Sequence, residues 1–127
     1  LTKQGKQNEL CFFMIKYGHQ IRFGGKNMVY HIVMWNFKEG IEESKKPEIL
    51  ENMKTNLEAL VGVVPGLLSV KYVANPLPTS THEFALVTTL EKVEDVKSYG
   101  AHPAHVAVAE NDIKPYACDR VCLDYEA

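Results

Sequence analysis

The chain has 127 residues, of which 46% are hydrophobic and 24% are charged, and its formal net charge at pH 7 is −2. This length suits one domain with a single core, and the composition is that of a globular protein. A general nucleic-acid-binding protein needs a basic face, so the weak negative charge argues against nucleic acid as a partner. No apolar run approaches the ~18 residues of a membrane span, so we expect no membrane partner.

The charge divides the chain into two unlike parts. Residues 1–27 hold five Lys or Arg and one Glu, a net charge of +4, whereas residues 28–127 hold nine Lys or Arg and fifteen Asp or Glu, a net charge of −6. The first part is interpreted as an N-terminal extension: a genuine arm, a cloning remnant, or an upstream region translated from a misplaced start. The last interpretation rests on Gly-Gly-Lys-Asn before Met28, which a purine-rich ribosome-binding site can encode. We expect the folded domain to span residues 28–127.

The first half of this domain predicts a strand, a helix and a second strand. Residues 29–37 are β-branched and aromatic on both faces, which is typical of a strand covered on both sides. Apolar residues then recur every three or four positions over residues 42–60, which predicts a helix. Pro47 fits only a first turn, so the regular helix begins near Lys46. Residues 67–74 follow as the second strand.

The second half predicts two more strands and two helices. A loop with two prolines at residues 75–81 joins the second strand to an antiparallel third strand. His102 precedes Pro103, and a residue before proline is pushed out of helical geometry, so one helix ends and another begins there. The predicted elements are a strand at 84–90, a helix at 92–99, a helix from 103 to about 113, and a strand at 120–125. This β-α-β-β-α-β order is that of an α+β, ferredoxin-like domain with a four-stranded antiparallel sheet.

Two helices cover one face of such a sheet and leave the other face bare. Both faces of the first predicted strand are rich in apolar residues: Tyr30, Ile32 and Met34 on one, and His31, Val33 and Trp35 on the other. A bare apolar face needs a second layer, and another copy of the same sheet is the simplest one. We therefore expect a homodimer through the open sheet face.

The three cysteines, at positions 11, 118 and 122, do not form a disulfide framework. In a regular strand Cys118 and Cys122 would share one face but lie about 13 Å apart, too far to bridge, at ~3.3 Å per residue. We expect reduced thiols in a cytoplasmic protein. A zinc site built on these two cysteines is a weaker alternative. We predict no metal site and no cofactor.

The densest group of side chains able to do chemistry surrounds residues 99–105. Pro103 places His105 near the third position of a helix, where the positive end of the helix dipole lowers the pKa of a histidine. A neutral imidazole near a pocket is what a general base requires. Tyr99 could donate a hydrogen bond to a developing oxyanion. Asp124 needs a partner if it is covered, and a histidine would serve.

Each of these residues also has a purely structural interpretation. His102 before proline is interpreted first as a helix cap, and His31 as a histidine of a strand whose hydrogen bonds are satisfied. Tyr99 could be a core aromatic residue. A metal site of His31, His102 and His105 is a weak alternative, because histidines spaced three apart across a proline break are a poor signal.

Four segments of residues 28–127 resemble the stress-responsive α/β-barrel family, often called Dabb proteins. They are MVYHIVMWNFK, VPGLLSVKYV, SYGAHPAHVAVAEND and CLDYEA, and the HPAH element is the most specific. The resemblance implies a ferredoxin-like monomer that dimerises through its sheets into an α+β barrel. It covers none of residues 1–27.

The resemblance also implies a site. In a plant polyketide cyclase of the family, the histidine matching His105 acts as a base and the tyrosine matching Tyr99 assists. The implied pocket lies between the sheet and the helices of each subunit, with binding residues His31, Val33, Trp35, Leu86, Thr88 and Asp124. Aromatic residues of the cyclase pocket correspond here to Met53, Leu57 and Val108, so its substrate does not carry over.

Three classes of function follow. The first is a small-molecule enzyme with a His/Tyr acid–base pair, such as a cyclase, an isomerase or a cofactor-free monooxygenase. The second is a non-catalytic protein that binds a small hydrophobic or carbonyl metabolite in the same pocket. The third is a structural stress protein with a very stable oligomer. We favour a pocket that binds a small metabolite, with His105 and Tyr99 as its catalytic residues and the reaction undetermined.

Overall fold

The computed structural model describes residues 27–127, so the predicted extension lies outside the described residues except for Asn27. The strands are β1 (Val29–Phe37), β2 (Leu67–Val73), β3 (Phe84–Leu90) and β4 (Ala117–Glu126). The helical elements are a 3-10 turn η3 (Glu43–Lys45), α1 (Lys46–Glu58), α2 (Val93–Ala101), α3 (Pro103–Val108) and a π-helical turn η4 (Ala109–Ile113).

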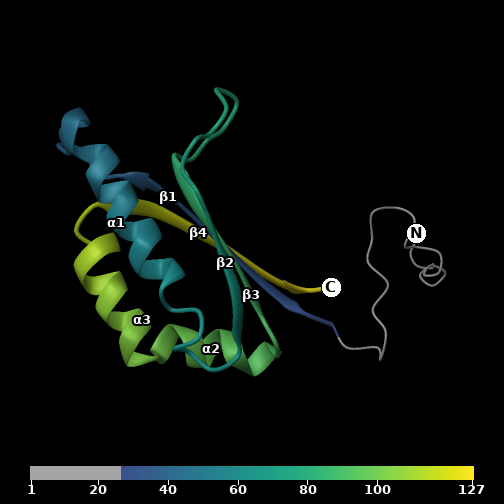
Figure 1. Ribbon diagram of the computed structural model, residues 1–127. Coiled ribbons are helices and arrows are strands. Elements are labelled where there is room, and N and C mark those ends of the chain that lie inside the picture. The colour runs from purple at the N-terminus through teal and green to yellow at the C-terminus, as the bar shows by residue number, and fades with distance from the viewer. Residues whose placement is uncertain (1–26) are drawn as a thin grey trace.

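The four strands form one antiparallel sheet in the order β2-β3-β1-β4. All three α-helices lie on the same side of this sheet, and β4 forms one of its edges (Figure 1). The predicted α+β, ferredoxin-like arrangement is confirmed. Among residues 27–127, every helix falls short of the length and hydropathy that crossing a membrane requires.

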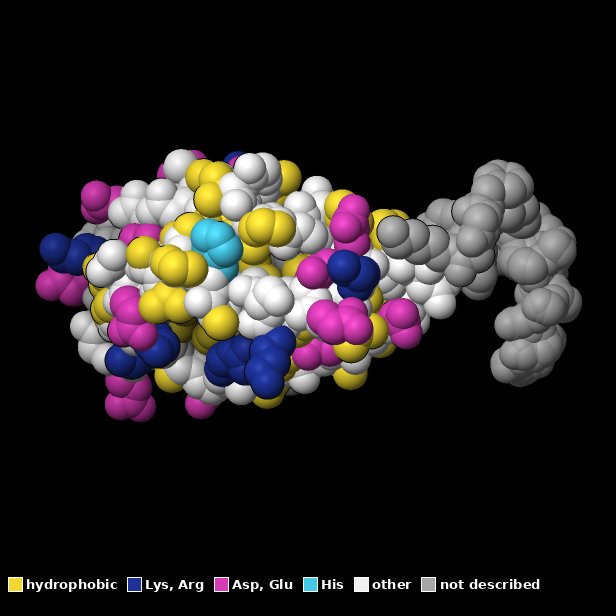
Figure 2. Space-filling model, turned by 90° about the horizontal axis from the view of Figure 1, so that it is seen from below, with side chains coloured by type: hydrophobic (Ala, Val, Ile, Leu, Met, Phe, Trp, Pro, Cys, Tyr) yellow, Lys and Arg dark blue, Asp and Glu magenta, His cyan; other side chains and the backbone are white. Residues whose placement is uncertain are grey.

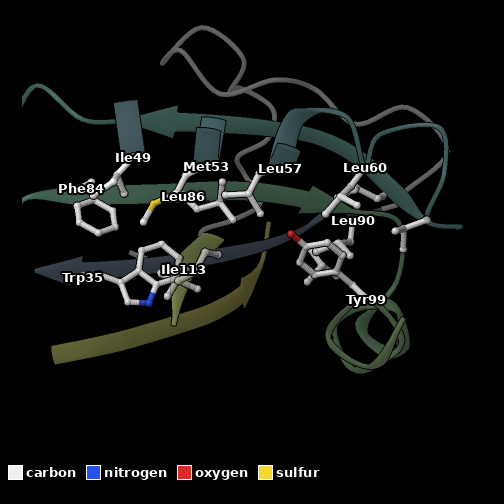
Figure 3. Packing of buried hydrophobic residues seen from close by; sticks show 14 residues of the cluster. Trp35, Ile49, Met53, Leu57, Leu60, Phe84, Leu86, Leu90, Tyr99 and Ile113 are labelled. Carbon is white, nitrogen blue, oxygen red and sulfur yellow. The ribbon is translucent and has the colours of Figure 1, made fainter. Parts of the chain in front are cut away.

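The core fills the space between the sheet and α1. Ile49, Met53 and Leu57 recur on one face of α1, and Met53 and Leu57 are fully buried. They meet inward-facing residues of β1 and β3 such as Trp35 and Leu86 (Figure 3). Burying each large apolar side chain contributes roughly 1.5–3 kcal/mol, so this stripe fixes the helix on the sheet. Tyr99 of α2 and Ile113 of η4 belong to the same core, and side chains of α3 such as Val108 pack against it.

The turn into β2 requires glycine at position 66. Gly66 has φ +85, a conformation that residues with a side chain rarely adopt. A Cβ on Gly66 would lie 2.4 Å from the carboxylate of Asp95. That carboxylate accepts a hydrogen bond from the backbone N–H of Lys92 at 3.0 Å, and the Gly66 carbonyl accepts one from Glu91 N–H at 2.9 Å. The turn at Gly66 therefore packs directly against the start of α2 and is hydrogen-bonded to the residue before it.

The last strand begins earlier than the sequence predicts and contains a β-bulge. β4 starts at Ala117 rather than near residue 120. Asn36 pairs with Cys118, whereas Met34 pairs with Val121, so one extra residue stands on β4 between the two pairs. Asp119 has φ 55 there, and its carboxylate accepts a hydrogen bond from the Asn36 side chain at 3.2 Å. Bulges of this kind add one unpaired residue and re-aim the side chains that follow.

The bulge corrects the expectation that Cys118 and Cys122 share one face of the strand. Residues paired across a sheet point to the same side. Cys118 pairs with Asn36 on the outer face, and Cys122 pairs with the buried Val33 on the helix-covered face. The two thiols therefore lie on opposite sides of the sheet.

The helices after β3 also differ from prediction at their ends. α2 extends to Ala101, and the helix that begins at Pro103 changes into the π-helical turn η4 after Val108. The interpretation of His102 as a cap is confirmed, because its Nδ1 accepts a hydrogen bond from the backbone N–H of Ala104 at 3.1 Å.

The sheet face turned away from the helices exposes large apolar side chains. Four from β1 and β4 stand out: Met34, Val121, Leu123 and Tyr125. Leu123 is 61% exposed, and the Tyr125 ring stacks on Tyr30 with 5.0 Å between centroids. By contrast, the face seen from below in Figure 2 mixes hydrophobic, basic and acidic side chains.

Candidate functional site

A cavity of about 330 Å³ lies between the sheet and the α2–α3 segment. Its apolar wall consists of Val33, Trp35, Leu86, Val96, Ala109 and Ile113. The remaining wall consists of His31, Tyr99, Gly100, His105, Lys114, Arg120, Cys122 and Asp124. Sites for small molecules commonly combine an apolar wall with a few polar groups in this way.

His105 is held in a defined tautomer at the start of α3. Its Nδ1 lies 3.2 Å from the carbonyl oxygen of Gly100. A carbonyl only accepts hydrogen bonds, so Nδ1 carries the proton and Nε2 keeps its lone pair. Burial lowers the pKa of His105, against the opposing effect of the Gly100 hydrogen bond. The expected lowering of the His105 pKa is confirmed, but its largest cause is burial rather than the helix dipole. His31, Arg120 and His102 lower the pKa further.

The ring of Tyr99 lies between two imidazoles. It tilts against His105 with 4.4 Å between centroids, and it meets His31 edge-on at 6.1 Å. Only 1% of the residue is exposed, and burial raises the pKa of Tyr99 to about 12, so the phenol is protonated. Among the described residues its hydroxyl has no hydrogen-bond partner. The ring is directed from α2 toward the sheet (Figure 3).

Thr88, which was expected to bind a ligand, is not part of the cavity wall. It pairs with His31 across β1 and β3, is fully buried, and has no hydrogen-bond partner for its hydroxyl in the described part of the chain. The Thr88 hydroxyl opposes the rise in the pKa of Tyr99, although the two hydroxyls do not reach hydrogen-bond geometry. The other five residues expected to bind a ligand do line the cavity.

His31 and Asp124 contact each other by a side-chain hydrogen bond across β1 and β4. The two residues are directly opposite in the sheet, and His31 Nδ1 lies 2.5 Å from Asp124 Oδ1. A histidine partner was expected for Asp124, and the structure shows that it is His31. The Cys122 thiol lies beside the pair, at 3.7 Å from His31 Nδ1 and 3.6 Å from Asp124 Oδ1.

Three polar residues of the wall were missed by sequence reasoning: Lys114, Arg120 and Cys122. Lys114 follows the π-helical turn and pairs with Glu110 at 2.6 Å. Arg120 and Cys122 alternate with Asp124 along β4, and this period of two is the signal that could have found them. Within residues 27–127, the His31, Cys122 and Asp124 ligand atoms all lie within 4.8 Å of one another, close enough to hold a metal ion.

Comparison with known proteins supports the fold. The model of the Stress responsive A/B Barrel Domain family matches residues 29–127. A dimeric protein of unknown function from Bacteroides fragilis is 29% identical, with TM-score 0.72, over 79% of this chain and 96% of that chain. A dimeric ferredoxin-like protein of unknown function from Thermobifida fusca is 24% identical, with TM-score 0.68, over 86% and 99%.

A third solved structure has an activity in its name. The hydroxynitrile lyase of Passiflora edulis is 20% identical, with TM-score 0.62, over 80% of this chain and 94% of that chain. At this level of identity the similarity shows the shared fold alone. The comparison with curated proteins finds no match.

Proposed function

This chain belongs to the stress responsive A/B barrel domain family, and we propose that its cavity binds a small carbonyl compound from which His105 removes a proton. The observation that carries the proposal is the state of His105: a neutral imidazole whose Nδ1 proton is engaged by Gly100, leaving Nε2 as the basic atom in the cavity wall. A base poised in this way is suited to proton abstraction at neutral pH.

The proton comes from the carbon next to the carbonyl group. As the C–H bond breaks, the proton moves to Nε2 and the electron pair moves to the carbonyl oxygen, which becomes an enolate. Tyr99 supports this step, because its phenol is protonated and its buried hydroxyl has no partner within residues 27–127. An unpaired buried hydroxyl costs ~1–3 kcal/mol, and a hydrogen bond to the enolate oxygen would offset that cost.

The rest of the cavity wall supports binding of a ligand with a large apolar part. Trp35, Leu86 and Ile113 offer a wall for it, while the His31–Asp124 pair supplies polar groups. Each Å² of apolar ligand surface that is removed from water contributes about 25 cal/mol to binding. The polar groups fix the orientation of the ligand.

Exchange of α-protons for deuterium in a panel of β-keto compounds tests the proposal. We expect the wild type to accelerate exchange by ~10²–10⁴-fold, the usual contribution of a positioned base, and His105→Ala to lose the acceleration. His82→Ala is the matched control, since His82 lies in the loop before β3 and outside the cavity wall. The enzyme proposal fails if the wild type and His105→Ala exchange these protons at the same rate.

A non-catalytic binding protein is the second candidate. The observation that favours it is the largely apolar wall, which suits a hydrophobic metabolite whether or not His105 acts as a base. Under this function, compounds of the same panel would bind with equal affinity to the wild type and to His105→Ala, and neither protein would accelerate exchange.

We also propose that two copies of the chain associate through the outer sheet face. The exposed apolar residues of β1 and β4 support this assembly, and so does the description of the Bacteroides fragilis and Thermobifida fusca relatives as dimeric. The cavity lies on the opposite side of the sheet, so association leaves the His105 side of the molecule open.

A further inference from the structure

We propose that His31, Cys122 and Asp124 form a zinc-binding site, here named the β1–β4 triad, in the wall of the cavity. The three side chains offer one imidazole nitrogen, one thiolate sulfur and one carboxylate oxygen within 4.8 Å of one another. Imidazole and thiolate ligands favour Zn²⁺ over the oxygen-preferring Mg²⁺ and Ca²⁺.

The distances within the triad fit tetrahedral zinc. Bonds of ~2.0–2.1 Å to nitrogen, ~2.3 Å to sulfur and ~2.0–2.2 Å to oxygen place tetrahedral ligand pairs that include sulfur about 3.6 Å apart. The Cys122 sulfur lies 3.7 Å from His31 Nδ1 and 3.6 Å from Asp124 Oδ1. His31 Nδ1 and Asp124 Oδ1, now 2.5 Å apart, would separate by about 0.9 Å to accept the metal between them.

The sheet holds the triad in place before any metal arrives. Cys122 and Asp124 are two positions apart on one face of β4, and His31 stands directly opposite Asp124 on β1. Since the three ligands sit on paired strands, ordering them costs little conformational entropy. The thiolate and the carboxylate together balance the two charges of the metal.

Three protein ligands leave the fourth zinc position open, the arrangement of catalytic rather than structural zinc sites. All three triad residues line the same cavity as His105 and Tyr99, so this position faces the space in which a small molecule would bind. A water molecule or a ligand oxygen would complete the coordination. The triad therefore adds a Lewis-acidic group to a cavity that already holds a base.

Metal titration of the full chain tests the triad, with Co²⁺ as a spectroscopic probe and Zn²⁺ as a competitor. We expect one Co²⁺ per chain with an ultraviolet thiolate-to-cobalt band, and its displacement by one equivalent of Zn²⁺. Cys122→Ser should abolish the band and weaken Zn²⁺ binding at least ~10-fold, and Asp124→Asn should weaken binding while keeping the band.

Cys118 provides the matched control. It lies on the same strand but on the opposite face of the sheet, so Cys118→Ser, combined with Cys11→Ser, should leave the band and the affinity unchanged. The proposal is overturned if wild-type protein gives no thiolate band, if the band survives in Cys122→Ser, or if Cys118→Ser removes it. Circular dichroism of each variant checks that it is folded. The readout is metal binding, so the result does not depend on whether His105 transfers protons.

Discussion

The imidazole of His105 packs on the ring of Tyr99, with 4.4 Å between the centroids and 52° between the planes. This contact joins the end of α2 to the start of α3 and excludes water from one side of each ring. It also explains two opposite pKa shifts, because burial disfavours the charged form of both groups: it lowers the pKa of His105 and raises that of Tyr99 to about 12. Both side chains are therefore neutral at pH 7.

The lowered pKa of His105 predicts how activity depends on pH. We expect the rate of α-proton exchange to stay constant as the pH falls through ~6.5, the ordinary histidine pKa, and to fall only at lower pH. Rate profiles measured from neutral to acidic pH check this. A rate that already declines above ~6.5 would contradict the lowered pKa.

The same shift predicts a pH-dependent stability. Below pH ~6.5 the unfolded chain binds a proton at His105 before the folded chain does, so the free energy of unfolding falls as the pH falls. His105→Gln removes this component and should flatten the dependence. Urea unfolding of both proteins across this range measures the difference, and equal slopes would show that His105 titrates alike in both states.

Tyr99→Phe separates the packing of the ring from the chemistry of its hydroxyl. Since the buried hydroxyl has no partner among the described residues, its removal should leave the free energy of unfolding unchanged or raise it by up to ~1 kcal/mol. The exchange rate should nevertheless fall at least ~10-fold if the hydroxyl donates to the enolate. Chemical unfolding and the exchange assay measure the two effects. A destabilised variant would reveal a hydrogen bond to the hydroxyl.

Gly66→Ala should destabilise the fold through two effects. The positive φ alone costs ~1–3 kcal/mol, and the added Cβ would also meet the Asp95 carboxylate. Gly40→Ala is the matched control, because Gly40 has φ +90 but nothing within 4 Å of a Cβ. Thermal unfolding should show a larger loss for Gly66→Ala, and equal losses would mean that Asp95 moves aside at no cost.

Leu123→Glu tests the outer sheet face. A charge in the middle of an apolar interface is costly to bury, so we expect the variant to be a monomer where the wild type is a dimer. Light scattering on a size-exclusion column measures the mass. Val63→Glu, at a similarly exposed position before β2, should remain dimeric. A dimeric Leu123→Glu protein would place the interface elsewhere.

Most of the fold follows from periodic sequence patterns. Val29–Phe37 and Phe84–Leu90 were predicted with the bounds that the structure has, because β-branched and aromatic runs between turn residues have few alternatives. The start of α1 was equally predictable, since Pro47 is restricted to a first turn. The ends of α2 and α3 were less accurate, because helix ends depend on local hydrogen bonds rather than on periodicity.

The candidate site was only partly predictable. His31, Tyr99, His105 and Asp124 were singled out by residue type, and all four line one cavity. Arg120 and Cys122 were missed, although they alternate with Asp124 along β4 and that period of two could have placed them on the same face of the sheet. Thr88 faces the helices as its alternation in β3 requires, but the packing above it covers its hydroxyl.

The bulge at Asp119 makes β4 a strand with two separate thiol environments. Cys118 donates to the backbone of Phe37 on the outer side, while Cys122 lies beside His31 in the cavity. The sheet therefore separates the two thiols. Within residues 27–127, one thiol can thus report on the proposed association of the sheets and the other on occupancy of the cavity.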